Sequence, residues 1–199
     1  MQNSNYVNPP PRLQAPRLCE TDAPLHVRVF GIYSDMTLQG FQSVLDQCGG
    51  QTEPIARKER DKLLQAWREV YAAPYHDAKG RWKLSQYEWH VFSFGYTRAL
   101  NGERAVAAYS DQSAPSLIVC PEDGRSPAWK LTDGNLPDFR KWGGDVYVWP
   151  DDLSWTMAFT HEVGLGLGPY FSQMEWAVAC RTASRHRRRT RRRTQPGEW

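Results

Sequence analysis

The feature that most restricts the fold is a long helical pattern over residues 52–73, which precedes a series of short strand patterns. Thr52 suits the N-cap, and Pro54 suits the first turn, where the missing N–H of proline removes no hydrogen bond. Pro74 is then expected to end the helix. The apolar side chains expected on its buried face are Leu63, Leu64, Trp67, Val70 and Tyr71. The pattern therefore predicts one long amphipathic helix with an apolar face to cover.

The patterns outside this helix are shorter and mostly strand-like. Strands are predicted over residues 27–33, 87–95, 116–120, 128–131, 145–149 and 154–160. Short helices are predicted over residues 37–48 and 102–109, with one or two helical turns over residues 135–142. The predicted fold class is α+β, a mainly antiparallel sheet packed against one long and several short helices in a single domain.

Composition divides the chain into three parts. Residues 1–24 contain five prolines and predict an irregular arm, and residues 25–179 carry the globular pattern. Residues 180–199 form a tail with eight arginines between residues 181 and 193. Like charges at this density repel one another, so the tail is predicted to be disordered. Without the tail the chain has 17 basic and 21 acidic residues, a net charge of −4 that the overall value of +3 conceals.

Three interpretations of the tail compete. As a nucleic-acid arm it would neutralise phosphates and release counterions, so its binding would weaken steeply with salt. As a solvated segment it would need no partner. As a stretch read from a shifted frame of the gene it would have no role in folding or function. No aromatic residues are interleaved with the arginines to stack on bases, which favours the solvated segment.

Hydropathy and cysteine spacing exclude or disfavour several protein classes. A mean hydropathy of −0.67 and the lack of an apolar run of about 18 residues exclude a membrane-spanning helix. The first residues contain no continuous apolar stretch of a secretory signal, so a cytoplasmic location is predicted. Cys19, Cys48, Cys120 and Cys180 form no C-x-x-C pair, which indicates reduced thiols. No cofactor and no metal site are predicted.

Two motifs that suggest catalysis are incomplete. His161 and Glu162 begin the zinc-protease pattern H-E-x-x-H, but Leu165 stands where the second histidine is needed. Glycines alternate over residues 164–168, yet their spacing fits neither the dinucleotide fingerprint nor the P-loop. A tightly turning or flexible connection is the preferred interpretation. No serine or cysteine lies in a G-x-S-x-G context, so no nucleophile is identified.

An acid/base or cation site is the alternative that these histidines leave open. His161 and Glu162, with Asp151 or Asp152, could act in a small hydrolase or a cation-dependent enzyme, and His90 lies in another predicted strand. The simpler interpretation is that each histidine is hydrogen-bonded within a sheet and each aspartate serves the turn.

Large rings lie beside carboxylates near the end of the globular part. Such rings usually belong to a core, but rings rimmed by acids are also typical of an interface for a basic partner. The residues predicted to form this partner-binding surface are Asp151, Asp152, Trp155, His161, Glu162 and Tyr170.

Several short segments occur in an order that resembles a known family. They are W-H-V-F-S at residues 89–93, L-N-G-E-R-A at 100–105, D-V-Y-V at 145–148, S-W-T at 154–156, T-H-E at 160–162 and G-P-Y-F at 168–171. Over residues 38–171 the chain resembles a family of small uncharacterised bacterial proteins that share W-H-x-F-S, D-x-Y-V, W-T, T-H-E and G-P-Y-F motifs. The resemblance implies a compact bacterial cytoplasmic α+β domain, and some similar small proteins are immunity or accessory factors beside toxin genes. The resemblance carries over no established activity.

The sequence favours a non-enzymatic bacterial protein-binding module, of which an immunity-type inhibitor of a basic toxin is the most specific form. The acidic globular part, the ring-rich end and the missing catalytic signature support this prediction. A small hydrolase or cation-dependent enzyme is the first alternative, and nucleic-acid binding through the tail is the second. A membrane partner is not expected.

Overall fold

The computed structural model describes residues 39–82, 87–124 and 126–193, with side chains placed as far as residue 183. Every described residue belongs to one compact unit, Thr37–Trp199. The predicted arm over residues 1–24 and the predicted strand over residues 27–33 lie outside the described residues.

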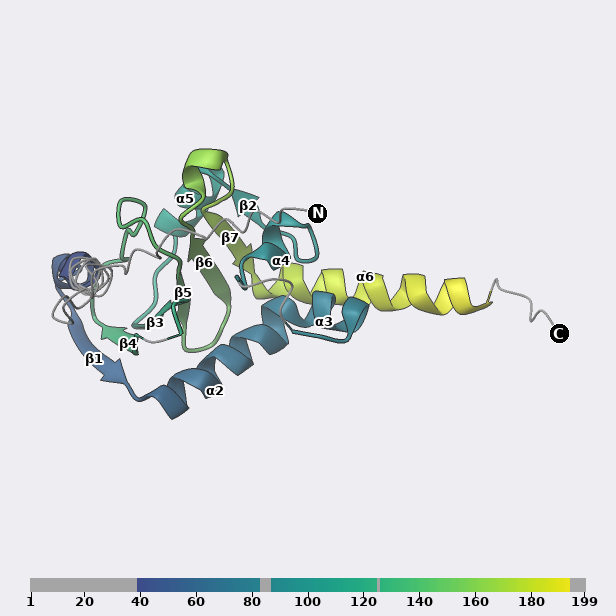
Figure 1. Cartoon of the computed structure of the whole chain (residues 1–199), viewed down its shortest axis with the longest axis horizontal. Helices are drawn as coiled ribbons and strands as arrows, with labels where there is room; N and C mark the ends of the chain where they lie inside the picture. Colours follow the sequence, from purple (N-terminus) through teal and green to yellow (C-terminus); the bar gives the residue numbers. More distant parts are fainter. Residues whose placement is uncertain (1–38, 83–86, 125, 194–199) are drawn as a thin grey trace, which may run out of the picture. The chain divides into compact units, whose positions relative to one another are not determined.

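A seven-stranded antiparallel sheet forms the centre of the fold (Figure 1). Its order is β1-β4-β3-β5-β6-β7-β2, and every neighbouring pair is antiparallel. The strands are β1 (Gln51–Ile55), β2 (Leu100–Asn101), β3 (Ser116–Pro121), β4 (Ala128–Thr132), β5 (Val146–Pro150), β6 (Trp155–Phe159) and β7 (Tyr170–Gln173). The predicted α+β class is confirmed, and four of the predicted strands lie in β3 to β6.

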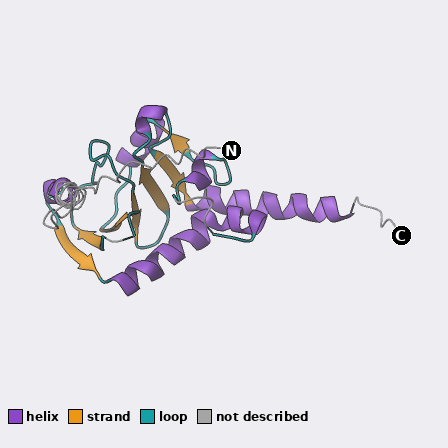
Figure 2. Cartoon of the chain, viewed as in Figure 1, coloured by secondary structure: helices purple, strands orange, loops and turns teal. Residues whose placement is uncertain are grey.

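Helices cover both faces of this sheet, so its central strands are buried throughout (Figure 2). Along β5, Val146 and Val148 belong to one apolar cluster, while Tyr147 and Trp149 belong to the other. This alternation follows from the two-residue period of a strand. Two-sided burial explains why β5 and β6 consist almost entirely of apolar residues.

The first cluster is covered by a helix over residues 39–47, by α5 (Glu103–Ser110) and by an irregular segment. Phe41 of the first helix stacks on Phe139 with ring centroids 5.0 Å apart. Tyr109 of α5 meets Phe159 edge-on at 5.7 Å. The short helices predicted over residues 37–48 and 102–109 are thus present. Residues 135–142, in contrast, form a loop with a turn rather than a helix.

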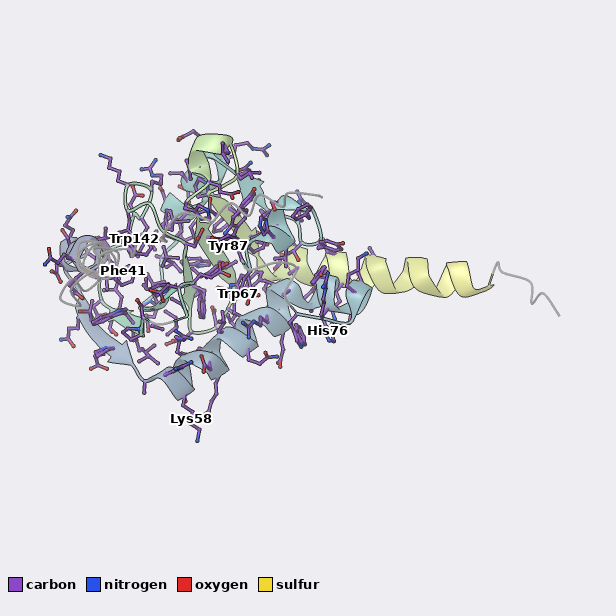
Figure 3. All side chains as sticks on the ribbon, viewed as in Figure 1. Phe41, Lys58, Trp67, His76, Tyr87 and Trp142 are labelled. Carbon is purple, nitrogen blue, oxygen red and sulfur yellow. The ribbon has the colours of Figure 1, made fainter. Side chains whose placement is uncertain are left out.

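The second cluster is covered by a run of helix over residues 57–79 and by two separate helices. The run comprises α2 (Arg57–Trp67), a π-helical segment (Arg68–Ala72) and α3 (Ala73–Lys79), and the separate helices are the single turn α4 (His90–Ser93) and the start of α6 (Met174–Arg193). Figure 3 shows Trp67 pointing from α2 toward the strands, whereas Lys58 points away from them. The long predicted helix is therefore present and covers the sheet as expected.

Both predicted ends of that helix are wrong. Residues 51–55 form the edge strand β1, so Thr52 is paired with Leu131 instead of capping a helix. An edge strand tolerates Pro54 because one side of it needs no donor. At the other end the helix continues past Pro74, because the π-helical segment ends at Ala72 and proline then stands in the first turn of α3, where no donor is needed.

Two further segments differ from the prediction. Residues 87–95 are not a strand: they form turns around α4, because Trp89, Val91 and Phe92 all pack into the second apolar cluster. Residues 180–193, predicted to lie in a disordered tail, continue α6 as helix. Arginine is a good helix former, which suits this extension. None of the described helices is both long and apolar enough to cross a membrane.

Candidate functional site

The six residues predicted to form one surface lie at two ends of a hairpin and on two faces of the sheet. Asp151 and Asp152 form the turn between β5 and β6. His161 and Glu162 follow β6 at its other end, about 17 Å away for a five-residue strand. Trp155 and Tyr170 are each only 4% exposed and belong to opposite apolar clusters. The structure therefore places two accessible pairs, His161 with Glu162 and Asp151 with Asp152, at opposite ends of β6. The buried ring of Tyr170 lies on the His161 side, near Trp89.

Hydrogen bonding at the β5–β6 turn gives its two aspartates structural partners. The carboxylate of Asp152 accepts a hydrogen bond of 2.9 Å from the Ser154 amide, and this bond lowers the pKa of Asp152. Asp151 pairs with Lys130 at 3.2 Å. Both aspartates line a shallow hollow with Ser116 and neighbouring residues. This turn matches the simpler interpretation, in which each aspartate serves the turn.

An imidazole–carboxylate pair marks the opposite end of the hairpin. His161 Nδ1 lies 2.8 Å from Asp145 Oδ2, and the His161 amide donates to Asp145 Oδ1 at 3.1 Å. His161 Nε2 faces Glu162 Oε1 at 3.6 Å. The register pairs Val146 with Phe159, so Asp145, which precedes β5, and the residues after β6 lie at the same end of the hairpin. His161 thus lies between two carboxylates, with its side chain 34% exposed.

Aromatic rings from another part of the chain surround this pair. The Tyr87 ring lies 4.9 Å from the His161 ring, and the Trp89 ring lies 6.3 Å from it. His90 packs on Trp89 at 4.0 Å, and its Nδ1 lies 3.1 Å from Ser93 Oγ. The single turn α4 and the residues before it therefore bring a second histidine to the site.

The electrostatic field at the site is negative. Burial raises the pKa of the Tyr87 hydroxyl, and the carboxylates of Asp145, Glu122 and Glu162 raise it further. For His90, burial lowers the pKa and outweighs the opposing attraction of Glu162 and Asp145. A positively charged group from a partner would be attracted to this region.

Hydrogen bonds and an ion pair of buried acids fix the position of the segment that carries Tyr87 and Trp89. The carboxylate of Glu122 accepts short hydrogen bonds from the Tyr147 hydroxyl and from the Glu88 amide. Glu88 is 1% exposed, and its Oε1 lies 2.6 Å from Arg68 Nη2 of the π-helical segment. Strand β5, the π-helical segment and the residues before α4 are thereby joined. The rings of the site are positioned by contacts that only the folded chain provides.

Exposed apolar side chains flank the pair. In the described part of the chain, the large hydrophobic residues that are exposed are Phe94 (63%), Val163 (39%), Leu165 (77%) and Val178 (54%). Phe94 packs near the His90 ring at 5.4 Å. Val163 and Leu165 lie in the short 3-10 turn that follows Glu162. A hydrogen bond of 2.9 Å from the Leu165 amide to the Glu162 carbonyl closes this turn. Phe94 is therefore next to His90, and Val163 and Leu165 directly follow Glu162.

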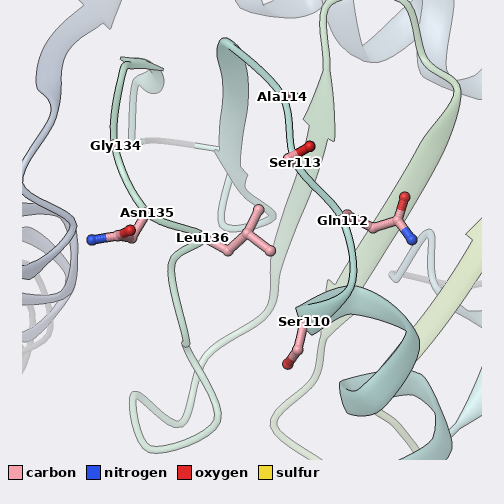
Figure 4. Close-up of a pocket in the computed structure, with 7 residues that line it drawn as sticks. All are labelled: Ser110, Gln112, Ser113, Ala114, Gly134, Asn135 and Leu136. Atoms are coloured by element: carbon pink, nitrogen blue, oxygen red, sulfur yellow. The ribbon is translucent and has the colours of Figure 1, made fainter.

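A separate surface pocket carries no acid/base chemistry (Figure 4). The residues that line it are Ser110, Gln112, Ser113, Ala114, Gly134, Asn135 and Leu136. None of these side chains is titratable, so this pocket supplies no proton donor or base. Among the described residues, no group of three or more His, Cys, Asp and Glu side chains is arranged to hold a metal ion.

Segments that carry the resemblance meet at this site. Residues 89–93, 145–148, 160–162 and 168–171 contribute Trp89, Asp145, His161 and Tyr170, and the Tyr170 ring stacks near Trp89 at 6.1 Å. A family model described as a domain of unknown function, DUF4275, matches residues 62–171. The chain belongs to the DUF4275 family. The match contains every segment of the site and ends before α6. No curated protein and no solved structure matches the DUF4275 chain.

Sequence reasoning missed part of this site. Asp145, Tyr87, Phe94 and Leu165 are not among the predicted surface residues, and His90 enters only as an alternative. The one available signal was the predicted hairpin, since strands over residues 145–149 and 154–160 place Asp145 opposite the end of the second strand. The approach of Tyr87 and His90 depends on tertiary packing and has no local signal.

Proposed function

We propose that this DUF4275 protein is a non-enzymatic binding protein that docks a basic protein partner on the His161 surface, defined as His90, Phe94, His161, Glu162 and Leu165. The observation that carries the proposal is that exposed apolar side chains lie next to His90 and in the turn that directly follows the carboxylate-flanked imidazole of His161. Apolar side chains grouped on a surface are typical of protein interfaces.

The charges around the His161 surface suit a basic partner. The carboxylates of Asp145 and Glu162 are 11% and 26% exposed, so they still act on an approaching cation. They also lie in a globular part with a net charge of −4. Acids of this kind raise the rate of encounter and select against acidic partners, while buried rings and apolar contacts supply most of the affinity. Inhibition of a basic toxin by an immunity-type protein is one specific form of this function.

The test compares variants of the His161 surface with a matched exposed residue elsewhere. The full chain, a Phe94→Ser/Leu165→Ser variant and a Val178→Ser control are used to capture partners from cells that express the protein. The captured protein is then purified and titrated. We expect it to be basic and to bind the double variant at least about tenfold more weakly, because apolar anchors contribute about 1–2 kcal/mol each. Binding to the Val178→Ser control should be unchanged.

Charge variants separate this surface from the one predicted from the sequence. Glu162→Gln and Asp151→Asn each remove one negative charge, but only Glu162 belongs to the His161 surface. We expect Glu162→Gln to weaken binding at low salt and Asp151→Asn to have little effect. Equal affinity of the Phe94→Ser/Leu165→Ser variant and the unaltered chain would contradict the proposal, as would an acidic partner.

The Asp145–His161 pair favours acid/base catalysis as a second candidate function. A carboxylate at Nδ1 orients an imidazole so that Nε2 can act as a base, which is the arrangement used in hydrolases. In this chain Nε2 faces Glu162 rather than a hydroxyl or thiol nucleophile. A generic hydrolase screen and calorimetric titration with divalent metals test this candidate. Turnover or stoichiometric metal uptake that is lost in His161→Ala would favour an enzyme over a binding protein.

A further inference from the structure

The carboxyl-terminal helix α6 carries the densest positive charge in the chain, and its first turns pack against the rest of the fold. Ala177 is fully buried in the second apolar cluster. One turn later, Arg181 Nε lies 2.9 Å from Asp77 Oδ2 of α3, and Figure 1 shows α3 lying beside α6. The helix then continues to Arg193. The basic half of α6, residues 181–193, therefore continues from helical turns that are packed on the fold.

The spacing of charge in this half is close to that of a nucleic-acid duplex. Residues 181–193 contain eight arginines and no acidic residue. At about 1.5 Å per residue these 13 residues of helix span about 20 Å, or one positive charge per ~2.4 Å. Duplex DNA carries one negative charge per ~1.7 Å of its axis. A helix also has a diameter of about 10–12 Å, which suits a major groove about 12 Å wide.

We propose that the basic half of α6 binds double-stranded DNA through its phosphates, without reading base sequence. A membrane surface fits less well, because a helix lying in a bilayer interface needs an apolar face. Residues 181–193 consist of Arg, Thr, Ala, Ser and His. Single-stranded nucleic acid also fits less well, because no Phe, Tyr or Trp is present there to stack on bases.

This binding is separate from the function proposed for the His161 surface. The DUF4275 match ends at Phe171, three residues before α6 begins. The globular part has a net charge of −4 and would repel DNA. We therefore assign phosphate binding to α6, and a failure of either proposal leaves the other in place.

The test measures binding of the full chain to a 25-base-pair duplex by fluorescence anisotropy between about 50 and 200 mM salt. For six or more phosphate contacts we expect the affinity to fall at least about 10³-fold over this range. Replacing Arg187, Arg188 and Arg189 by Gln should make the slope of log K against log salt shallower by about 2 to 3, because each contact contributes about 0.9. Replacing the same three residues by Lys should restore most of the affinity, since lysine also binds phosphate as a point charge.

A matched control removes three cations from another helix. Arg57, Lys58 and Lys62 are exposed on α2, and their joint replacement by Gln changes the net charge by the same amount. We expect this variant to bind DNA as the unaltered chain does, and circular dichroism verifies that each variant is folded. The proposal is overturned if the α2 variant loses as much affinity as the α6 variant. Tighter binding to single-stranded DNA or to anionic vesicles than to the duplex would also overturn it.

Discussion

The indole Nε1 of Trp67 donates a hydrogen bond of 2.9 Å to the hydroxyl of Thr156, and both residues are fully buried. This bond joins the end of α2 to the central strand β6. Replacing Thr156 by Val keeps the shape of the side chain but leaves the indole N–H without this acceptor. We expect the free energy of unfolding to fall by about 1–3 kcal/mol, the usual penalty for an unsatisfied buried polar group.

Urea denaturation measures this change, and Thr132→Val is the matched control. Thr132 is only half-buried at the end of β4, so its replacement should alter the free energy of unfolding by less than about 0.5 kcal/mol. Similar values for the two variants would show that the Trp67–Thr156 bond does not stabilise the fold.

Two ion pairs of different burial should differ sharply in their effect on stability. The Arg68–Glu88 pair has side-chain exposures of 25% and 1%, whereas those of the Lys62–Glu59 pair are 65% and 54%. Arg68→Met removes the cation beside a buried carboxylate and should lower the free energy of unfolding by about 3 kcal/mol. Lys62→Met should lower it by less than about 0.5 kcal/mol. Chemical denaturation of both variants decides the point, and a small effect of Arg68→Met would mean that Glu88 does not depend on this partner.

The alternating glycines after Glu162 should differ in their tolerance of alanine. Gly164 has room for a Cβ, and Gly166 has room but a φ of +76°. Gly168 has a φ of +102°, and a Cβ there would lie 2.6 Å from Thr160 Oγ1. Alanine should therefore change the free energy of unfolding by less than about 0.5 kcal/mol at Gly164. It should lower it by about 1 kcal/mol at Gly166 and by more than about 2 kcal/mol at Gly168.

Thermal and urea unfolding of the three single variants test this order. A strongly destabilised Gly164→Ala variant, or a tolerated Gly168→Ala variant, would show that the segment adopts another path. The same series separates the structural role of these glycines from the phosphate-loop role that their alternation superficially suggests.

Acidification should destabilise the protein through His90. Burial lowers the pKa of His90 below its ordinary value of 6.5, although Glu162 and Asp145 oppose this shift and His161 adds to it. The unfolded chain then binds a proton at a higher pH than the folded chain does. Stability is therefore retained above about pH 6.5 and decreases as the pH falls below it.

Urea unfolding at pH 7.5 and 5.5 should show a smaller loss of stability for His90→Gln than for the unaltered chain. An NMR titration of the His90 ring supplies an independent measurement. A midpoint above 6.5 would contradict the prediction, because the neighbouring carboxylates would then outweigh burial.

Local patterns were sufficient for much of the sheet and for the presence of its main helix. The strands around residues 116–121 and 128–132 are bounded by turn residues, and those around residues 146–150 and 155–159 are joined by a Pro-Asp-Asp turn. Their order along the chain predicts antiparallel neighbours. The amphipathic pattern over α2 was equally clear, because its apolar residues recur at helical spacing.

Local patterns failed where packing outweighed propensity. Residues 87–95 are rich in rings and favour a strand, yet they turn through α4 to place Trp89 and Phe92 against the sheet. Residues 51–55 contain a proline and suit a helix start, yet pairing with β4 draws them into the edge of the sheet. The strand that pairs with residues 51–55 and the surface that buries Trp89 and Phe92 both come from residues distant in the sequence.

The sequence by itself determined the α+β class, the main strand order along the chain and the separation of an acidic globular part from a basic end, because periodicity and charge are local properties. Only the tertiary structure decided which side chains share a surface. It placed Asp145 beside His161 through the β5–β6 register, and it brought Tyr87 and His90 to the same edge through helix packing. A site of this kind is made of contacts between distant segments, and such contacts exist only after the chain has folded.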